Sequence, residues 1–157
     1  MFIRLCFSLF AVTLLMIVTP TANALQKGPP TEVDETPFTV EGLCAFPVQF
    51  VLQGKAKTIE LSGGRTIATS PGLSATLTNV DDPENETVLN ITGVFHITVS
   101  ENGDVKTVVT GRNLLNDPEA GFVLAIGTFS FIFDAAGNLI QPLTGQGQLI
   151  DVCSLLS

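Results

Sequence analysis

The sequence predicts an all-β fold, an antiparallel meander of about eight strands closed into a barrel. From Cys44 onward, apolar and polar residues alternate with the two-residue period of a strand, and no window keeps a helical period. Turn-forming glycine, asparagine and proline pairs separate the alternating runs. Two cysteines bracket these runs, near the two ends of the expected domain. A β-sandwich is the alternative architecture.

Residues 1–24 have the features of a signal peptide. Arg4 gives a positive start, an apolar run follows from Leu5 to Val18, and Ala22-Asn23-Ala24 is a small-x-small cleavage pattern. The run is shorter than the roughly 20 apolar residues of a membrane-spanning helix. We therefore expect a secreted protein, extracellular or periplasmic, that does not span a membrane.

Residues 25–42 are expected to form a flexible acidic leader before a single β-domain over residues 43–157. The stretch contains Gly28-Pro29-Pro30 and the acidic residues Glu32, Asp34 and Glu35, with few apolar side chains. Such a composition is typical of linkers.

The expected strands of the domain follow each other with short connections. They include the alternating runs 46–53, 57–61, 73–78, 89–99, 105–110, 122–133 and 139–152. The segment Glu101-Asn102-Gly103-Asp104 is a strong hairpin signal between two of them. Short connections favour antiparallel neighbours.

Cys44 and Cys153 are the only cysteines after the signal peptide, and we expect them to form a disulfide. An exported chain folds in an oxidising compartment, where two cysteines normally pair. In a closed meander with an even number of strands, the first strand begins beside the end of the last. The two cysteines occupy these two points, so the expected disulfide supports closure.

The strand over 119–133 is apolar on both faces. Phe129, Phe131 and Phe133 form one row, and Leu124 and Ile126 lie on the opposite face. The leader, a loop or a second subunit could cover the outer face. We expect a homo-oligomer that forms through this strand.

The interior of a barrel of this size is filled by side chains or holds one small ligand. Phe50, Phe95, Phe129 and Phe131 belong to the bulky apolar row and are expected to line the core or a pocket. Both interpretations remain open, a filled core and a cavity for a small apolar ligand.

The charge of the chain excludes nucleic acid as a partner. Fifteen Asp and Glu residues outnumber seven Lys and Arg, the net charge is −8, and no basic segment offsets it. His96 is the only histidine, so we expect neither a metal site nor a cofactor.

Four polar residues are candidates for ligand binding. Arg65 and Arg112 each follow a glycine near a strand end, where a guanidinium could bind an anionic group. Asn113 follows Arg112, and His96 points away from the apolar row. Ordinary surface ion pairs and a surface histidine are the alternatives. No catalytic set is apparent.

Two Asn-x-Thr sequons begin at Asn85 and Asn90. They matter only in a host that glycosylates its secreted proteins.

Several segments resemble a family of small secreted bacterial β-proteins of unassigned function. They are Ile59-Glu60-Leu61, Gly63-Gly64-Arg65-Thr66, Ser70-Pro71-Gly72, Ile91–His96, Thr110–Leu114 and Asp134–Leu139. A weaker likeness, through Gly111-Arg112-Asn113 and the phenylalanine-rich strand after it, is to the dirigent and allene-oxide-cyclase-like barrels. This likeness implies a barrel.

These patterns predict a secreted β-barrel that acts as a binding or interaction module, with a small apolar molecule as the candidate ligand. The first alternative is a structural or surface-associated protein with a filled core. The second is a barrel enzyme of the cyclase or isomerase type.

Overall fold

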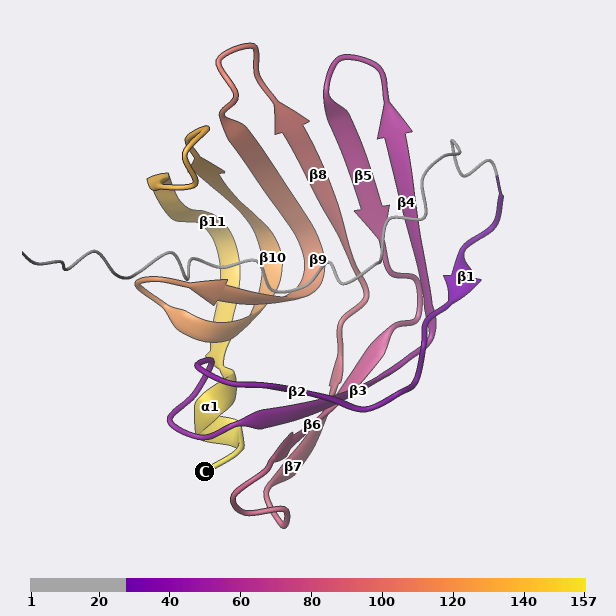
Figure 1. Cartoon of the computed structure of the whole chain (residues 1–157), viewed down its shortest axis with the longest axis vertical. Coiled ribbons are helices and arrows are strands. Elements are labelled where there is room, and N and C mark those ends of the chain that lie inside the picture. Colours follow the sequence, from indigo (N-terminus) through magenta and orange to yellow (C-terminus); the bar gives the residue numbers. More distant parts are fainter. Residues whose placement is uncertain (1–27) are drawn as a thin grey trace, which may run out of the picture.

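The protein is an all-β molecule of two antiparallel sheets, seen in a computed structural model that describes residues 28–157 (Figure 1). The expected signal peptide lies outside the described residues. The larger sheet has, in spatial order, β1 (Thr31–Glu32), β4 (Lys55–Leu61), β5 (Arg65–Thr69), β8 (Gly93–Val99), β9 (Val105–Asp117), β10 (Gly121–Phe133) and β11 (Leu139–Asp151). The smaller sheet consists of β2 (Phe38–Val40), β3 (Val48–Gln53), β6 (Ser74–Asn79) and β7 (Glu86–Asn90). A single helical turn, α1 (Val152–Leu155), follows β11.

At three connections the chain passes from one sheet into the other without reversing its direction (Figure 1). Strand β3 continues into β4 at Gly54, β5 continues into β6, and β7 continues into β8. The paired strands are antiparallel throughout. The alternating runs and short turns of the sequence predicted this pairing.

The expected closure into a barrel is not found. In the described part of the chain, β11 pairs with β10 alone and forms one edge of the larger sheet, and β1 forms the other edge. The strands bend sharply instead of curving into a ring. The two halves then pack against each other, an arrangement closer to the sandwich alternative.

A row of glycines across four strands makes the bend. Gly93 pairs with Gly111, Gly111 with Gly127, and Gly127 with Gly147. The φ angles of the last three are 88°, 138° and 147°, a region that side-chain-bearing residues rarely adopt. A Cβ atom on Gly127 would lie 2.2 Å from the carbonyl oxygen of Gln146. Without side chains at these positions, adjacent backbones approach closely enough to fold the sheet.

The packing shows the direction of the bend. Ala125 and Phe129 lie on opposite sides of Gly127, four residues apart in β10, and belong to one buried cluster with Val109. In a straight strand, positions four apart are separated by about 13 Å. The sheet therefore bends toward the face that carries these side chains.

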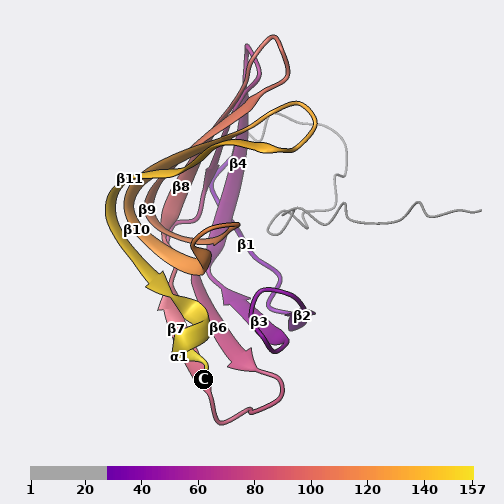
Figure 2. The same cartoon turned by 90° about the vertical axis from the view of Figure 1, so that its left-hand side faces the viewer.

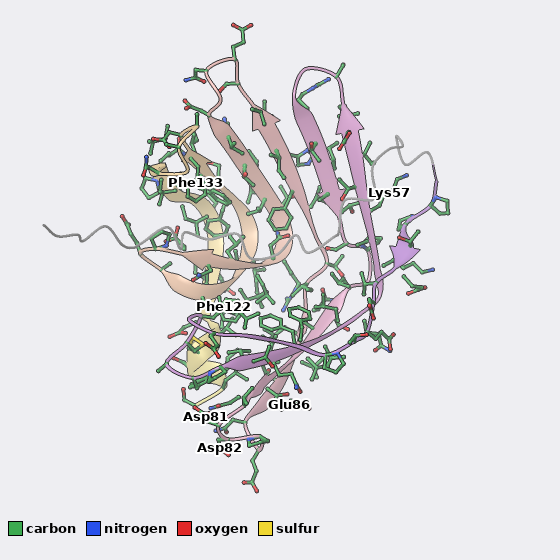
Figure 3. All side chains as sticks on the ribbon, viewed as in Figure 1. Lys57, Asp81, Asp82, Glu86, Phe122 and Phe133 are labelled. Atoms are coloured by element: carbon green, nitrogen blue, oxygen red, sulfur yellow. A yellow bond between two sulfur atoms is a disulfide. The ribbon has the colours of Figure 1, made fainter. Side chains whose placement is uncertain are left out.

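The main core lies between the smaller sheet and the parts of β9 and β10 nearest their connecting turn. Phe50 of β3 packs against Phe122 of β10 with ring centroids 6.0 Å apart, and Phe38 stacks on Phe50 at 5.2 Å. Figure 3 places Phe122 in the middle of the molecule, above the smaller sheet. Burying each large apolar side chain contributes about 1.5–3 kcal/mol, so this cluster is the main stabilising contact between the two halves.

The doubly apolar part of β10 is covered within the chain itself. Phe122 and Leu124 belong to the main core, and Val123 and Ala125 on the opposite face are only 3% and 1% exposed. Intrachain packing therefore covers both faces over residues 122–125, whereas Ile126 and residues 130–133 stay partly exposed.

Cys44 and Cys153 form the predicted disulfide, with their Cα atoms 5.5 Å apart. The bond joins the segment before β3 to the helical turn after β11. The two strands that it ties together belong to different sheets, so the disulfide closes the chain without closing a barrel.

The structure differs from the expected flexible leader. Strand β1 pairs with β4, and β2 pairs with β3. Val33, Phe38 and Val40 pack against the main core. These apolar residues are few, but each is partly buried. Their packing holds the segment on the edges of the two sheets.

Among residues 28–157, helix α1 has four residues, and no helix there has the length and apolarity needed to cross a bilayer.

Candidate functional site

The bend gives the larger sheet two unlike faces. The inner face, on the concave side, carries the side chains of Phe95, Ile97, Val109, Phe129, Phe131 and Leu143. The outer face, on the convex side, carries those of Arg65, His96, Thr98, Lys106, Val108, Thr128, Ser130, Thr144 and Gln146. Figure 2 shows the curvature of β9, β10 and β11 edge-on.

The inner face is a mainly apolar strip that is only partly covered, with the buried Thr107 between Ile97 and Phe131. Phe95, Val109 and Phe129 are directly opposite one another on β8, β9 and β10. Val109 is fully buried and Phe129 is 6% exposed, because the bend brings Ala125 against them. Phe95, Ile97 and Phe131 remain partly exposed. The strip can therefore contact an apolar group without rearrangement of the core.

The end of the strip nearest the β10–β11 turn is aromatic. The rings of Phe131 and Phe133 meet edge to face with centroids 5.7 Å apart. Figure 3 shows Phe133 in the upper half of the molecule, well away from Phe122 in the main core. The strip and the main core are thus separate apolar surfaces.

The outer face is polar and contains an open hollow of about 320 Å³. The side chains that line it include Lys106, Val108, Thr128, Ser130, Thr144 and Gln146.

Hydrogen bonds fix part of this hollow. Gln141 Nε2 donates to Ser130 Oγ and to Thr144 Oγ1, each at 3.3 Å. The Thr144 hydroxyl also donates to the carbonyl oxygen of Ser130 at 3.5 Å. The two hydroxyls and the amide are therefore held as one polar cluster beside the hollow.

Two of the four candidate ligand-binding residues share the outer face. Arg65 pairs with Thr98 across β5 and β8, and His96 lies two residues before Thr98 on the same side. Lys106 pairs with Thr98 from β9. Arg65 and Lys106 therefore flank Thr98 in one row across three strands, with His96 in the neighbouring row.

The other two candidates lie beyond the glycine row and do not join them. Arg112 Nε donates to the carbonyl oxygen of Asn90 at 3.0 Å. Asn113 is 2% exposed, and its Nδ2 donates to the Thr110 carbonyl oxygen at 3.0 Å. Its Oδ1 has no hydrogen-bond partner in the described residues and lies against Gly93, where a Cβ atom would be 2.2 Å away. Arg112 and Asn113 thus serve the packing of the bend.

The four candidate phenylalanines are divided between two clusters. Phe50 is fully buried in the main core, and Phe95, Phe129 and Phe131 belong to the inner face. They do not line one common pocket.

Of the two sequon asparagines, Asn85 precedes β7 and Asn90 is its last residue. Asn85 Nδ2 donates to Asp82 Oδ2 at 3.0 Å, whereas Asn90 is exposed and its Oδ1 accepts a bond from the Thr92 amide at 2.9 Å. Asn90 is the more accessible of the two.

Acidic side chains gather in the turn between β6 and β7. Figure 3 shows Asp81, Asp82 and Glu86 at the end of the molecule farthest from the β8–β9 hairpin. Among residues 28–157, no three histidine, cysteine or acidic side chains converge as metal ligands.

The sequence did not reveal the polar residues of the hollow. The apolar residues of these strands alternate with Lys106, Thr128, Ser130 and Thr144. Alternation therefore predicts only that these four side chains lie on the face opposite the apolar row. The only available signal was the repetition of hydroxyl residues on the side opposite the phenylalanine row.

The chain matches no protein-family model, no curated protein and no solved structure. The resemblances to small secreted bacterial proteins and to the dirigent-like barrels therefore stay predictions.

Proposed function

We propose that the protein is a secreted binding module whose inner face receives an apolar group. The observation that carries the proposal is the strip of partly exposed Phe95, Ile97 and Phe131, continuous with the buried Val109 and Phe129. Contiguous exposed apolar surface of this kind is characteristic of binding surfaces. The disulfide is consistent with an oxidising compartment, extracellular or periplasmic.

The open shape of the strip favours a chain-like ligand that lies along the sheet. A chain that is covered on one side loses about half of its water contact, which is worth about 0.4 kcal/mol per methylene. An eight-carbon chain then gains about 3 kcal/mol, which corresponds to a dissociation constant of several millimolar. Binding of a single short chain is therefore weak, and NMR is the suitable assay.

The test is a titration of the oxidised protein, labelled with ¹³C at phenylalanine and isoleucine, with straight-chain alcohols from 1-butanol to 1-octanol. We expect shifts of Phe95, Ile97 and Phe131 signals and about a twofold gain in affinity per added methylene. Shifts spread evenly over the molecule, or an affinity that does not depend on chain length, would contradict the proposal.

A pair of variants localises the site. Phe131→Ala should weaken octanol binding about threefold or more, because the partly exposed ring contacts the chain. Val88→Ala shortens an apolar side chain that is 65% exposed on β7, away from the strip, and should leave the affinity unchanged. Equal effects of the two substitutions would contradict the assignment.

A structural or surface-associated role is the second candidate, and the well-filled main core favours it. Val48, Phe50 and Leu77 are fully buried, and Leu124 is 1% exposed. If the alcohols cause no shifts at the inner face, this alternative replaces the binding module. The cyclase or isomerase alternative lacks comparable support, because Arg112 and Asn113 lie apart from His96.

A homo-oligomer through residues 119–133 would have to use the part of β10 from Ile126 to Phe133, which the chain leaves partly exposed except at Phe129. Sedimentation equilibrium at micromolar concentration tests it: a dimer supports this contact, and a monomer removes it.

A further inference from the structure

On β5, β8 and the part of β9 before Gly111, the outer face carries the cations Arg65 and Lys106 and no acidic side chain, in a chain whose net charge is −8. Arg65, His96 and Lys106 all point outward from β5, β8 and β9. Their outward neighbours on the same part of the sheet are hydroxyl, amide or aliphatic residues, and Glu60 of β4 points to the inner face beside Thr66. Arg65 and Lys106 thus have no acidic neighbour on these strands, and Glu32 is paired with Lys55 at the β1–β4 edge of the sheet.

The acidic residues nearest to the outer face are occupied within their own hairpin loops. Asp104 Oδ2 accepts a bond from Asn102 Nδ2 at 2.8 Å. Asp134 accepts bonds from the Asn138 backbone amide and side chain, both at 2.8 Å. The Lys106 side chain forms no ion pair or hydrogen bond with any residue that the structure describes, and the Arg65 side chain bonds only through Nε, to the Ser62 carbonyl oxygen at 3.2 Å. The two cations are therefore available to a ligand.

We propose that the outer face binds an acidic oligosaccharide, a chain of uronate sugars that runs across the strands. Neighbouring strands are about 4.8 Å apart, close to the length of one pyranose unit. Arg65 and Lys106 are two strands apart, about 10 Å, and meet carboxylates two sugar units from each other. The hollow beside Lys106 holds a further unit, whose hydroxyls bond to Ser130, Thr144 and Gln146.

The other anionic polymers fit this surface less well. A nucleic acid would need a row of aromatic side chains for its bases to stack on, and the outward residues of β5, β8 and β9 offer only the His96 ring. An anionic lipid would need an apolar surface beside the cations, which lies on the inner face. Each unit of a uronate chain carries one carboxylate together with free hydroxyls, and the outer face combines two cations with hydroxyl and amide side chains. The proposal is independent of apolar binding at the inner face.

The test is a ¹⁵N NMR titration of the oxidised, exported protein with a (1→4)-linked tetrauronate. We expect amide shifts confined to the outward positions of β5, β8, β9, β10 and β11, and an affinity that falls with added salt. Maltotetraose, which has the hydroxyls without the charge, and tetraglutamate, which has the charge without the sugar rings, should bind at least about tenfold more weakly.

Variants separate specific recognition from general charge attraction. Arg65→Gln combined with Lys106→Gln should lower tetrauronate affinity about tenfold, two- to fivefold for each cation. Lys55→Gln removes the same charge from a residue that pairs with Glu32 at 3.3 Å and should change the affinity less than about twofold. Lys106→Arg keeps the charge and should retain binding.

Three results would overturn the proposal: no shifts on the outer face, tetraglutamate binding as tight as tetrauronate, or an equal loss in Lys55→Gln. Circular dichroism of each variant confirms that the fold is kept, which is expected because these side chains are exposed.

Discussion

Replacing Gly127 with alanine should strongly destabilise the protein, because Gly127 is at the centre of the bend. The new Cβ atom would lie 2.2 Å from the Gln146 carbonyl oxygen and 2.8 Å from the Cα atom of Gly147. Both are backbone atoms of the partner strand, so no side-chain rotation relieves the contact. The φ angle of 138° adds a strain of about 1–3 kcal/mol for any residue other than glycine.

Strain and overlap together should reduce the free energy of unfolding by about 3 kcal/mol or more. Domains of this size have a total stability of about 5–15 kcal/mol, so the effect is a large part of the whole. Guanidinium unfolding followed by far-UV circular dichroism measures it, since the chain has no tryptophan or tyrosine for fluorescence.

Gly137→Ala is the matched control. Gly137 has a φ angle of 85°, but a Cβ atom there would meet nothing within 4 Å. Its substitution should cost about 1 kcal/mol through strain alone. A Gly127→Ala protein whose free energy of unfolding lies within about 0.5 kcal/mol of the wild-type value would refute the role of the glycine row. Equal costs at both positions would show that backbone overlap does not contribute.

The remaining predictions concern the disulfide and the acid sensitivity of one turn. Replacing Cys44 and Cys153 with serine should remove about 4.8 kcal/mol in the chain-entropy model, since the bond spans 109 residues; an unchanged guanidinium midpoint would contradict this. The pKa of Asp134 is lowered from 3.8, chiefly by the hydrogen bond from the Asn138 side chain and then by backbone amides. Because the folded pKa is the lower one, the carboxylate stabilises the fold above about pH 4, and this contribution is lost as the pH falls through the folded pKa. Asp134→Asn should therefore show a smaller loss of stability than the wild type between pH 5 and 2.5, and parallel curves would argue against it.

The strands and the disulfide could be predicted from the sequence because their signals are local. Alternation over five to seven residues defines a strand, and the two cysteines that follow the expected signal peptide leave one intramolecular pairing. The absence of closure could not be predicted. Gly93, Gly111, Gly127 and Gly147 look like isolated strand glycines, and only the register of four strands places them in one row.

The leader shows the limit of composition as a guide. Its prolines and acids indicated a linker, but Val33, Phe38 and Val40 are sufficient to dock it on two sheet edges. The same limit applies to the cationic surface. Arg65 and Lys106 are 41 residues apart in the sequence, so no basic segment revealed that they flank one threonine.

The division of the phenylalanines was partly predictable. The alternation of apolar and polar residues predicted that Phe95, Phe129 and Phe131 share one face. The register of β8, β9 and β10 puts them on the same face. Phe50 was grouped with them because a closed barrel has one interior. The bend creates two apolar surfaces instead, and Phe50 belongs to the other one.

The alcohol titration tests the central claim most directly, because it distinguishes the open inner face from the filled core in one experiment. The account predicts that 1-octanol shifts the ring signals of Phe95 and Phe131 and leaves those of Phe50 unchanged. Shifts of the Phe50 ring signals, or no shifts of the Phe95 and Phe131 ring signals, would contradict it.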